Sequence, residues 1–239
     1  MSEKPILFNT AMVRAIIEGK KTVTRRVIKG VNDKNFIGYV TCSVPKGNEG
    51  KAAFGKGSIK DIVNANVEKC IRPPYKQGDI LYVRETWCRG DIIGANDDMD
   101  ESNIILYYAD GYIKENLDYE TIKWRPSIHM PKEVARIFLR VTNVKVERLQ
   151  AMRDEDFFKE GIREFTKDSV VKKYDTEPPR FKWQDMPKTP KEAFIKLWDN
   201  TVPKGLYTNL WYANPWVWVI EFEVVTEDTE TGEYIKIFQ

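Results

Sequence analysis

The stretch Gly19–Arg26 gathers the side chains of this chain that are best suited to chemistry. It reads GKKTVTRR, with paired lysines, threonines and arginines, and the next carboxylate along the chain is Asp33. Hydroxyls beside fixed cations suit a phosphate, a carboxylate or a developing oxyanion. Two interpretations are open from these residues. The stretch is either a polar strand that faces water, or the floor of a site that binds anions or nucleotides and acts on them.

Alternation along a strand separates these side chains. In a strand that begins at Thr22, the side chains of Thr22, Thr24 and Arg26 share one face and Val23 points to the other. Thr24 is a candidate nucleophile if a neighbouring lysine is desolvated enough to act as its base. Lys21 lies at the corner before the strand. The candidate ligand-binding residues of this stretch are Lys20, Thr22, Arg25 and Arg26.

Glu160 is a candidate for proton transfer because of its position. It falls in the last turn of a predicted helix that ends at Gly161, where the negative end of the helix dipole disfavours a carboxylate. Such a position would raise its pKa, which suits an acid or base. The same placement is also common on protein surfaces.

Glu85 is the second carboxylate candidate, for ligand binding. It shares one face of a predicted strand with Leu81 and Val83, so it needs a partner if that face is buried. A structural ion pair is the preferred interpretation, with Arg84 or an arginine of Gly19–Arg26 as the partner.

Trp124–Pro131 mixes aromatic, cationic and imidazole side chains between prolines. Trp124 and His129 could line a pocket that stacks on a base. The preferred alternative is a rigid connection whose Trp124 and Met130 fill the core. Gly50–Gly57 nearly spells a phosphate-binding loop, but Gly57 replaces the required Ser or Thr, so a glycine-rich loop is expected.

The composition limits the classes of function. The 239 residues are 42% hydrophobic and 31% charged, with a net charge of +2, so nucleic-acid binding would need a local patch rather than a global polycation. A single histidine and scattered cysteines argue against a metal site, and no cofactor is expected. The cysteines and the N-terminus predict a cytoplasmic chain with reduced thiols. No apolar run is long enough to cross a membrane.

The polar candidates must be positioned by a framework of strands and helices that periodicity predicts. Asn9 or Thr10 would cap the first helix, and a bulge near Asn143 would explain a change of apolar parity. A Thr189–Glu192 capping box begins the last helix. The predicted strands are Pro5–Phe8, Thr22–Ile28, Ile80–Trp87, Ile104–Ala109, Arg136–Leu149, Trp216–Val225 and Tyr234–Phe238, and the predicted helices are 10–18, 154–160 and 190–201.

Two polar segments resemble insertions, at about 29–74 and 163–188. The first contains one plausible hairpin between Phe36–Ser43 and Ala52–Phe54, and residues 89–102 are expected to form an acidic loop. Single helices between strands, without regular alternation, predict an α+β fold in which one domain, residues 1–239, contains a curled sheet or small β-barrel.

These residues together resemble the ASCH domain of the PUA-like superfamily. The resemblance starts with a strand, a helix and the pattern GxKTxTxR, and it looks especially close to the longer ASCH proteins of phages and prophages. It continues in Gly78–Trp87, Trp124–Pro131, Glu160–Gly161 and Pro215–Phe222. It covers most of the chain outside the two insertions.

The resemblance implies a PUA-like β-barrel with flanking helices and a cleft that binds RNA or nucleotides. Small bacterial members are amidohydrolases that remove the acetyl group from the exocyclic nitrogen of acetylcytidine. Their catalytic lysine, threonine and glutamate match Lys21, Thr24 and Glu160. Simple alternation puts Lys21 opposite Thr24, so this match needs a bend at the Gly19–Lys21 corner.

Three functions are therefore expected to compete. The first is binding of RNA or a nucleotide, with amide hydrolysis on a modified pyrimidine if the chain is an enzyme. The second is a non-enzymatic RNA-binding module. The third is a metal-independent ribonuclease, since other ASCH proteins are reported as ribonucleases.

Overall fold

The protein is an α+β chain made mostly of strands. The computed structural model describes residues 2–41, 47–58, 60–93, 99–111, 122–177, 179–201, 211–228, 231 and 234–237. The α-helices in these residues are α1 (Thr10–Ile17), α2 (Asp154–Lys159) and α3 (Pro190–Thr201). The strands are β1 (Glu3–Leu7), β2 (Val23–Val27), β3 (Asn35–Tyr39), β4 (Ala52–Ser58), β5 (Asp61–Ile71), β6 (Ile80–Arg84), β7 (Trp87–Ile93), β8 (Met99–Tyr107), β9 (Phe138–Arg148), β10 (Arg163–Lys167), β11 (Val171–Asp175), β12 (Trp216–Glu227) and β13 (Tyr234–Lys236).

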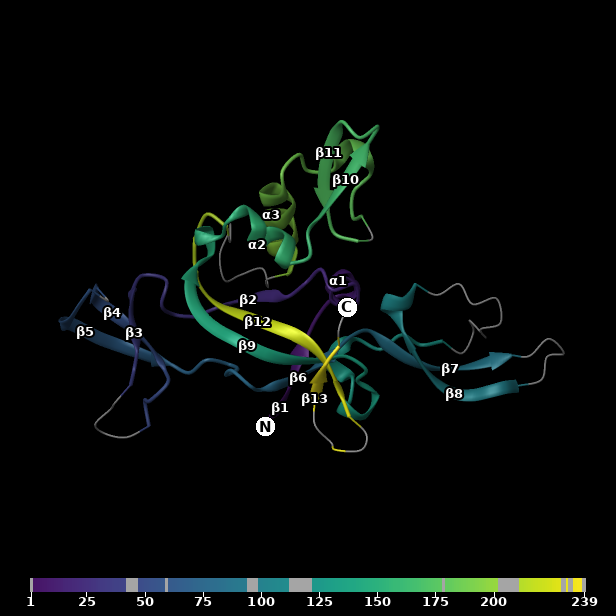
Figure 1. Ribbon diagram of the computed structural model, residues 1–239, viewed down its shortest axis with the longest axis horizontal. Coiled ribbons are helices and arrows are strands. Elements are labelled where there is room, and N and C mark those ends of the chain that lie inside the picture. Colours follow the sequence, from purple (N-terminus) through teal and green to yellow (C-terminus); the bar gives the residue numbers. More distant parts are fainter. Residues whose placement is uncertain are drawn as a thin grey trace.

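A mixed sheet forms the centre of the molecule (Figure 1). Its strand order is β1-β6-β9-β12-β13, and β2 also pairs with β12. β1 and β6 are parallel, and the other pairs are antiparallel. The strands that the structure describes do not close into a barrel, so the predicted barrel is not found among them.

Both faces of the central sheet are covered. One core cluster includes Val83, Leu139 and Ile220, and a second joins Val217 and other residues of β12 to helices α2 and α3. Figure 1 shows α2, α3 and the β10–β11 hairpin stacked above the sheet. The arrangement places the end of α2 and the inner face of α3 next to β2.

Several predicted elements are confirmed in detail. Asn9 caps α1 by accepting the amide of Met12, and α3 buries the predicted stripe of Ala193, Phe194, Leu197 and Trp198. The predicted bulge is also present, because Glu221 faces Asn143 while Phe222 faces Val141, which leaves Thr142 without a partner. These features follow from local rules of capping and periodicity.

Two predictions about the middle of the chain are wrong. The expected strand Ile80–Trp87 is split at Glu85 and Thr86 into β6 and β7, which belong to different sheets. Most of the expected acidic loop at 89–102 instead belongs to β7 and β8, which pair as an antiparallel hairpin. Alternation continues through the break, so the apolar pattern alone does not reveal it.

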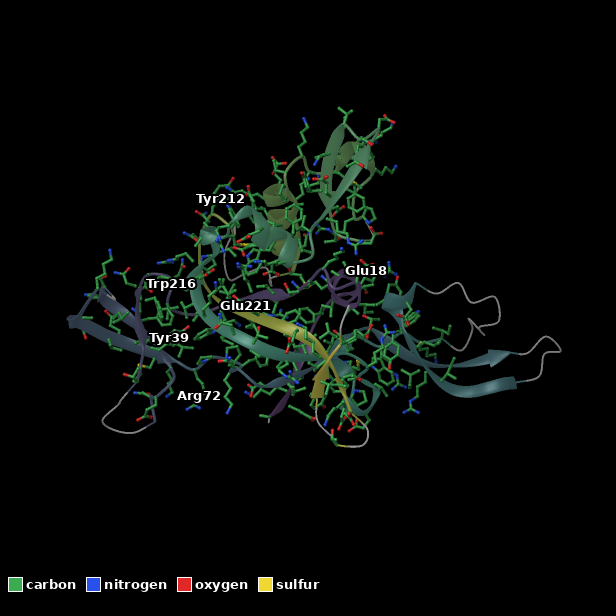
Figure 2. The ribbon with its side chains drawn as sticks, viewed as in Figure 1. Glu18, Tyr39, Arg72, Tyr212, Trp216 and Glu221 are labelled. Atoms are coloured by element: carbon green, nitrogen blue, oxygen red, sulfur yellow. The ribbon has the colours of Figure 1, made fainter. Side chains whose placement is uncertain are left out.

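The two insertions contain ordered secondary structure. The described part of residues 29–74 contains the antiparallel sheet β3-β4-β5, and residues 163–188 contain the β10–β11 hairpin. Phe54 of β4 packs 6.0 Å from the ring of Trp216, which Figure 2 shows at the end of β12 that faces the small sheet. The glycine-rich stretch Gly50–Gly57 is mostly strand β4 and forms no phosphate-binding loop.

Other findings concern cysteines and membranes. Cys70 and Cys88 are free, whereas Cys42 and Ser43 of the predicted hairpin lie outside the described residues. Within the ranges given above, no helix is long and apolar enough to span a bilayer.

Candidate functional site

The corner after α1 places Lys21 inside the protein. Gly19 has a φ of 66°, and the amides of Lys20 and Lys21 both donate to the carbonyl of Ala15 at 2.8 Å. Glycine tolerates this left-handed conformation without steric cost. The chain therefore bends before β2 begins at Val23, so strand alternation does not determine where the Lys21 side chain points. The expected bend at the Gly19–Lys21 corner is present.

Lys21 is fully buried and all three of its ammonium protons have an acceptor. Its Nζ donates to the carbonyl of Val23 at 2.8 Å, to the carbonyl of Glu160 at 3.0 Å and to Oε2 of Glu160 at 2.6 Å. Burial lowers the pKa of Lys21 from its usual value, and the carboxylate of Glu160 opposes this effect. No hydrogen bond joins Lys21 to Thr24 in the described structure.

Glu160 is held at the end of α2 by the glycine that follows it. Gly161 has a φ of 98°, and a Cβ at this position would lie 3.0 Å from the Cβ of Ala15. The second carboxylate oxygen of Glu160 accepts from Nη1 of Arg25 at 3.1 Å. The carboxylate thus joins Lys21 and Arg25, and all three side chains are buried. We call Lys21, Arg25 and Glu160 the buried ion network.

Arg25 has further acidic neighbours. Its Nη2 lies 3.5 Å from Asp156 and 3.9 Å from Glu147. Its Nε is buried and has no hydrogen-bond partner in the part of the chain that is described. A buried donor without an acceptor is costly, so it marks a place where a ligand or water would be stabilising.

A cavity of about 210 Å³ adjoins the buried ion network. We call it the β2–α3 cavity, because most of its wall comes from β2 and α3. Its lining residues are Met12, Thr24, Arg25, Arg26, Val27, Lys29, Glu160, Phe194, Leu197, Trp198 and Thr201.

The wall of the β2–α3 cavity combines charge, hydroxyls and aromatic surface. Lys29 is exposed, and neither an acceptor nor a carboxylate partner for it is found among the described residues. The indole Nε1 of Trp198 is buried and likewise has no partner there. The hydroxyl of Thr24 makes no hydrogen bond within the described ranges, although Thr24 is only 3% exposed. The cavity therefore offers several unused polar groups beside an apolar wall.

The predicted site residues separate into two groups. Lys21, Thr24, Arg25, Arg26 and Glu160 come together at the β2–α3 cavity or directly behind its wall. Lys20 and Thr22 are exposed and do not line it. Thr22 and Thr24 were expected on one face, yet Thr22 is exposed while Thr24 is buried.

Glu85 and the Trp124–Pro131 segment lie elsewhere. The partner of Glu85 is Arg136, at 3.0 Å, rather than Arg84 or an arginine of Gly19–Arg26. Burial raises the pKa of Glu85, and the hydrogen bond from Arg136 opposes the shift. Trp124 packs edge-on against Tyr108, and His129 is exposed. None of these three residues lines the β2–α3 cavity.

Sequence reasoning missed the residues that α3 contributes. Phe194, Leu197 and Trp198 were predicted to be core, and they are buried, but they also close a cavity over β2. The apolar stripe of α3 indicates which face of the helix is buried. It does not indicate which strand that face packs against. Lys29, two residues after the end of β2, could have been found as a continuation of the basic stretch.

Comparison with known proteins does not identify the function of this site. In comparisons with family models, curated proteins and solved structures, no family model, protein or structure matches the chain. No group of three or more His, Cys, Asp and Glu side chains that could hold a metal ion is found in the described ranges.

Proposed function

We propose that the chain binds a nucleotide or a segment of single-stranded RNA, with one nucleoside in the β2–α3 cavity. The observation that carries this proposal is the composition of the cavity wall, in which the cationic side chains of Arg26 and Lys29 line the same cavity as the ring of Trp198. Bases are recognised by stacking and by hydrogen bonds to their edges, and phosphates by cations. The resemblance to ASCH domains supports the same function, and with it the PUA-like classification of the fold.

The size of the cavity fits one nucleoside better than a longer chain. Pockets for drug-sized ligands usually measure roughly 300–1,000 Å³. At about 210 Å³, the β2–α3 cavity accommodates a base with part of its sugar. The unused donors of Arg25 and Trp198 would meet acceptors on such a ligand.

Binding of a short, fluorescently labelled single-stranded RNA tests this function. At roughly 0.1 M salt, Lys29→Ala should weaken binding about fivefold, because one phosphate contact is lost. Lys167→Ala is the matched control: this exposed lysine on β10 lines neither this cavity nor the second one described below. No binding by the unmodified chain, or equal loss in both variants, would contradict the proposal.

Hydrolysis of an acylated cytidine is the second candidate function. The observation in its favour is that Glu160, the ion-pair partner of the fully buried Lys21, lines the same cavity as Thr24. A lysine whose pKa is lowered reaches its neutral, basic form more readily.

The reaction would proceed through an ester on Thr24. The neutral Nζ of Lys21 takes the proton of the Thr24 hydroxyl while Oγ1 attacks the acetyl carbonyl carbon. The bond from that carbon to the exocyclic nitrogen breaks, and the proton passes to the nitrogen with Glu160 as the relay. Water then hydrolyses the ester and releases acetate. In the first step, Nζ of Lys21 must break its hydrogen bond to the carbonyl of Val23 and approach the hydroxyl of Thr24 instead.

Turnover of acetylcytidine separates the two candidates. Thr24→Val removes the hydroxyl with little change in shape, and it should abolish turnover while nucleoside binding persists. Thr24→Ser retains a hydroxyl and should recover part of the rate. Turnover that survives Thr24→Val would exclude this mechanism, and loss of intact RNA in the binding assay would instead favour a ribonuclease.

A further inference from the structure

A second cavity, of about 420 Å³, lies beside the first. We call it the arginine cavity. It is lined by Pro5, Ile6, Leu7, Arg26, Val27, Arg72, Pro74, Tyr75, Arg84 and Trp218. Three different segments supply its arginines: Arg26 belongs to β2, Arg84 ends β6, and Arg72 directly follows β5. No aspartate or glutamate is among the lining residues.

None of these arginines forms an ion pair with a carboxylate among the described residues. Arg26 donates to the carbonyl of Leu7 at 2.8 Å, and Arg84 donates to the carbonyl of Ile128. Arg72 is exposed and makes no hydrogen bond or ion pair within the described residues; Figure 2 shows it below the central sheet, near the end of the small sheet. The buried Nε of Arg84 also lacks an acceptor there.

This arrangement differs from that of the structural arginines of the chain. Arg25 and Arg136 each contact buried or half-buried carboxylates, which compensate their charge. Three guanidinium groups around one cavity repel each other unless an anion lies between them. Arginine forms bidentate hydrogen bonds with phosphate, so a phosphate group is the anion that fits this geometry.

Aromatic side chains accompany the arginines. Trp218 lies directly opposite Arg26 in the pairing of β12 with β2, and Tyr75 is half-buried on the same cavity wall. Proteins that bind single-stranded nucleic acid combine aromatic side chains with cations, because the bases stack on the rings while the phosphates contact the positive charges.

The two cavities have a common wall, because Arg26 and Val27 line both of them. We infer that the arginine cavity binds the phosphate and sugar of a nucleotide adjacent to the one in the β2–α3 cavity. The ligand is then a phosphodiester-linked chain rather than a free nucleoside. This inference depends on the proposed binding function and specifies its substrate class.

Calorimetric titrations with cytidine, with a trinucleotide of cytidines and with inorganic phosphate test the inference. The trinucleotide should bind the unmodified chain more tightly than either small ligand. Arg72→Ala should weaken trinucleotide binding about tenfold, as expected for the loss of a charge-assisted hydrogen bond, and leave cytidine binding unchanged. Arg72→Lys should recover part of the affinity, and Lys167→Ala should have no effect.

The outcomes distinguish this inference from the proposed function. If cytidine binds but the trinucleotide binds no tighter, or if Arg72→Ala changes neither affinity, the second subsite is refuted while the first remains. If inorganic phosphate competes as well as the trinucleotide, the cavity is a free-anion site and the inference is wrong. If neither nucleoside nor trinucleotide binds, the proposed function fails and the inference fails with it.

Discussion

The carboxylate of Glu160 connects two cations that are distant in sequence from it. It contacts Lys21 and Arg25 within 3.1 Å, and no side chain of the three is more than 4% exposed. Charges buried in this way depend on each other, because the loss of one leaves the others uncompensated. The same network also forms part of the cavity wall, so stability and function are coupled at this residue.

Glu160→Gln should therefore be strongly destabilising. We expect the free energy of unfolding to fall by about 3–5 kcal/mol, because Lys21 and Arg25 lose their shared counter-charge. Urea denaturation monitored by tryptophan fluorescence measures this change. Glu155→Gln on the exposed face of α2 is the control and should change stability by less than about 0.5 kcal/mol. Equal effects of the two substitutions would show that the network contributes no stability.

The lowered pKa of Lys21 predicts how acetylcytidine turnover depends on pH. If the neutral amine is the base, acetylcytidine turnover should rise as pH increases toward the lowered pKa, and level off below the usual lysine pKa. Thr24→Ser should lower the plateau and leave the midpoint unchanged, because the base is the same. Rates measured across the pH range check this, and a rate that falls as pH rises would contradict the role of Lys21.

At the scale of elements, two glycine-ended helices bring the network together. Gly19 follows the C-cap residue of α1 and Gly161 follows that of α2, and the second glycine lies against Ala15 of the first helix. This contact fixes the distance between the Lys21 corner and the Glu160 carboxylate. The helix ends thus position Lys21 and Glu160, while β2 positions Arg25 and Thr24.

Gly161→Ala should push the C-terminal ends of α1 and α2 apart and destabilise the protein. Its positive φ costs an L-residue about 1–3 kcal/mol, and the new methyl group would also meet the Cβ of Ala15 at 3.0 Å. Gly78→Ala is the matched control, since Gly78 has a φ of 85° with open space around its Cβ position. Chemical denaturation should show a larger loss for Gly161→Ala. Equal losses would mean that the Gly161–Ala15 contact is unimportant.

Local rules predicted elements well and their boundaries less well. The stripe of α3 and the bulge of β9 follow from periodicity, which sequence displays directly. The break between β6 and β7 was missed because Leu81, Val83, Glu85 and Trp87 continue the alternation and are all buried, although Trp87 belongs to another sheet. Which sheet a strand joins depends on long-range packing.

At the scale of the whole molecule, the candidate site depends on contacts between distant parts of the chain. Lys21 and Glu160 are 139 positions apart, and their pairing was expected only from the family resemblance. The Trp198 wall and the arginine cavity were not expected at all. They combine α3 and the end of the 29–74 insertion with β2, which no local pattern reveals.

A net charge of only +2 predicts that binding is local. A plot of the logarithm of RNA affinity against the logarithm of salt concentration should be linear, and Lys29→Ala should make its slope shallower by about 0.7, the value for one phosphate of a single strand. Lys167→Ala should leave the slope unchanged. Titrations at several salt concentrations provide this measurement. Affinity that does not depend on salt would exclude phosphate contacts in the site.

We propose that nucleic acid occupies the two cavities beside β2. The most direct test is photocrosslinking of a single-stranded RNA that carries 4-thiouridine, followed by mass spectrometry of tryptic peptides. The peptides that contain Trp198 and Tyr75 should carry the crosslinked nucleotide, because these rings line the β2–α3 and arginine cavities. Crosslinks confined to other parts of the chain, such as the β7–β8 or β10–β11 hairpins, would contradict the claim.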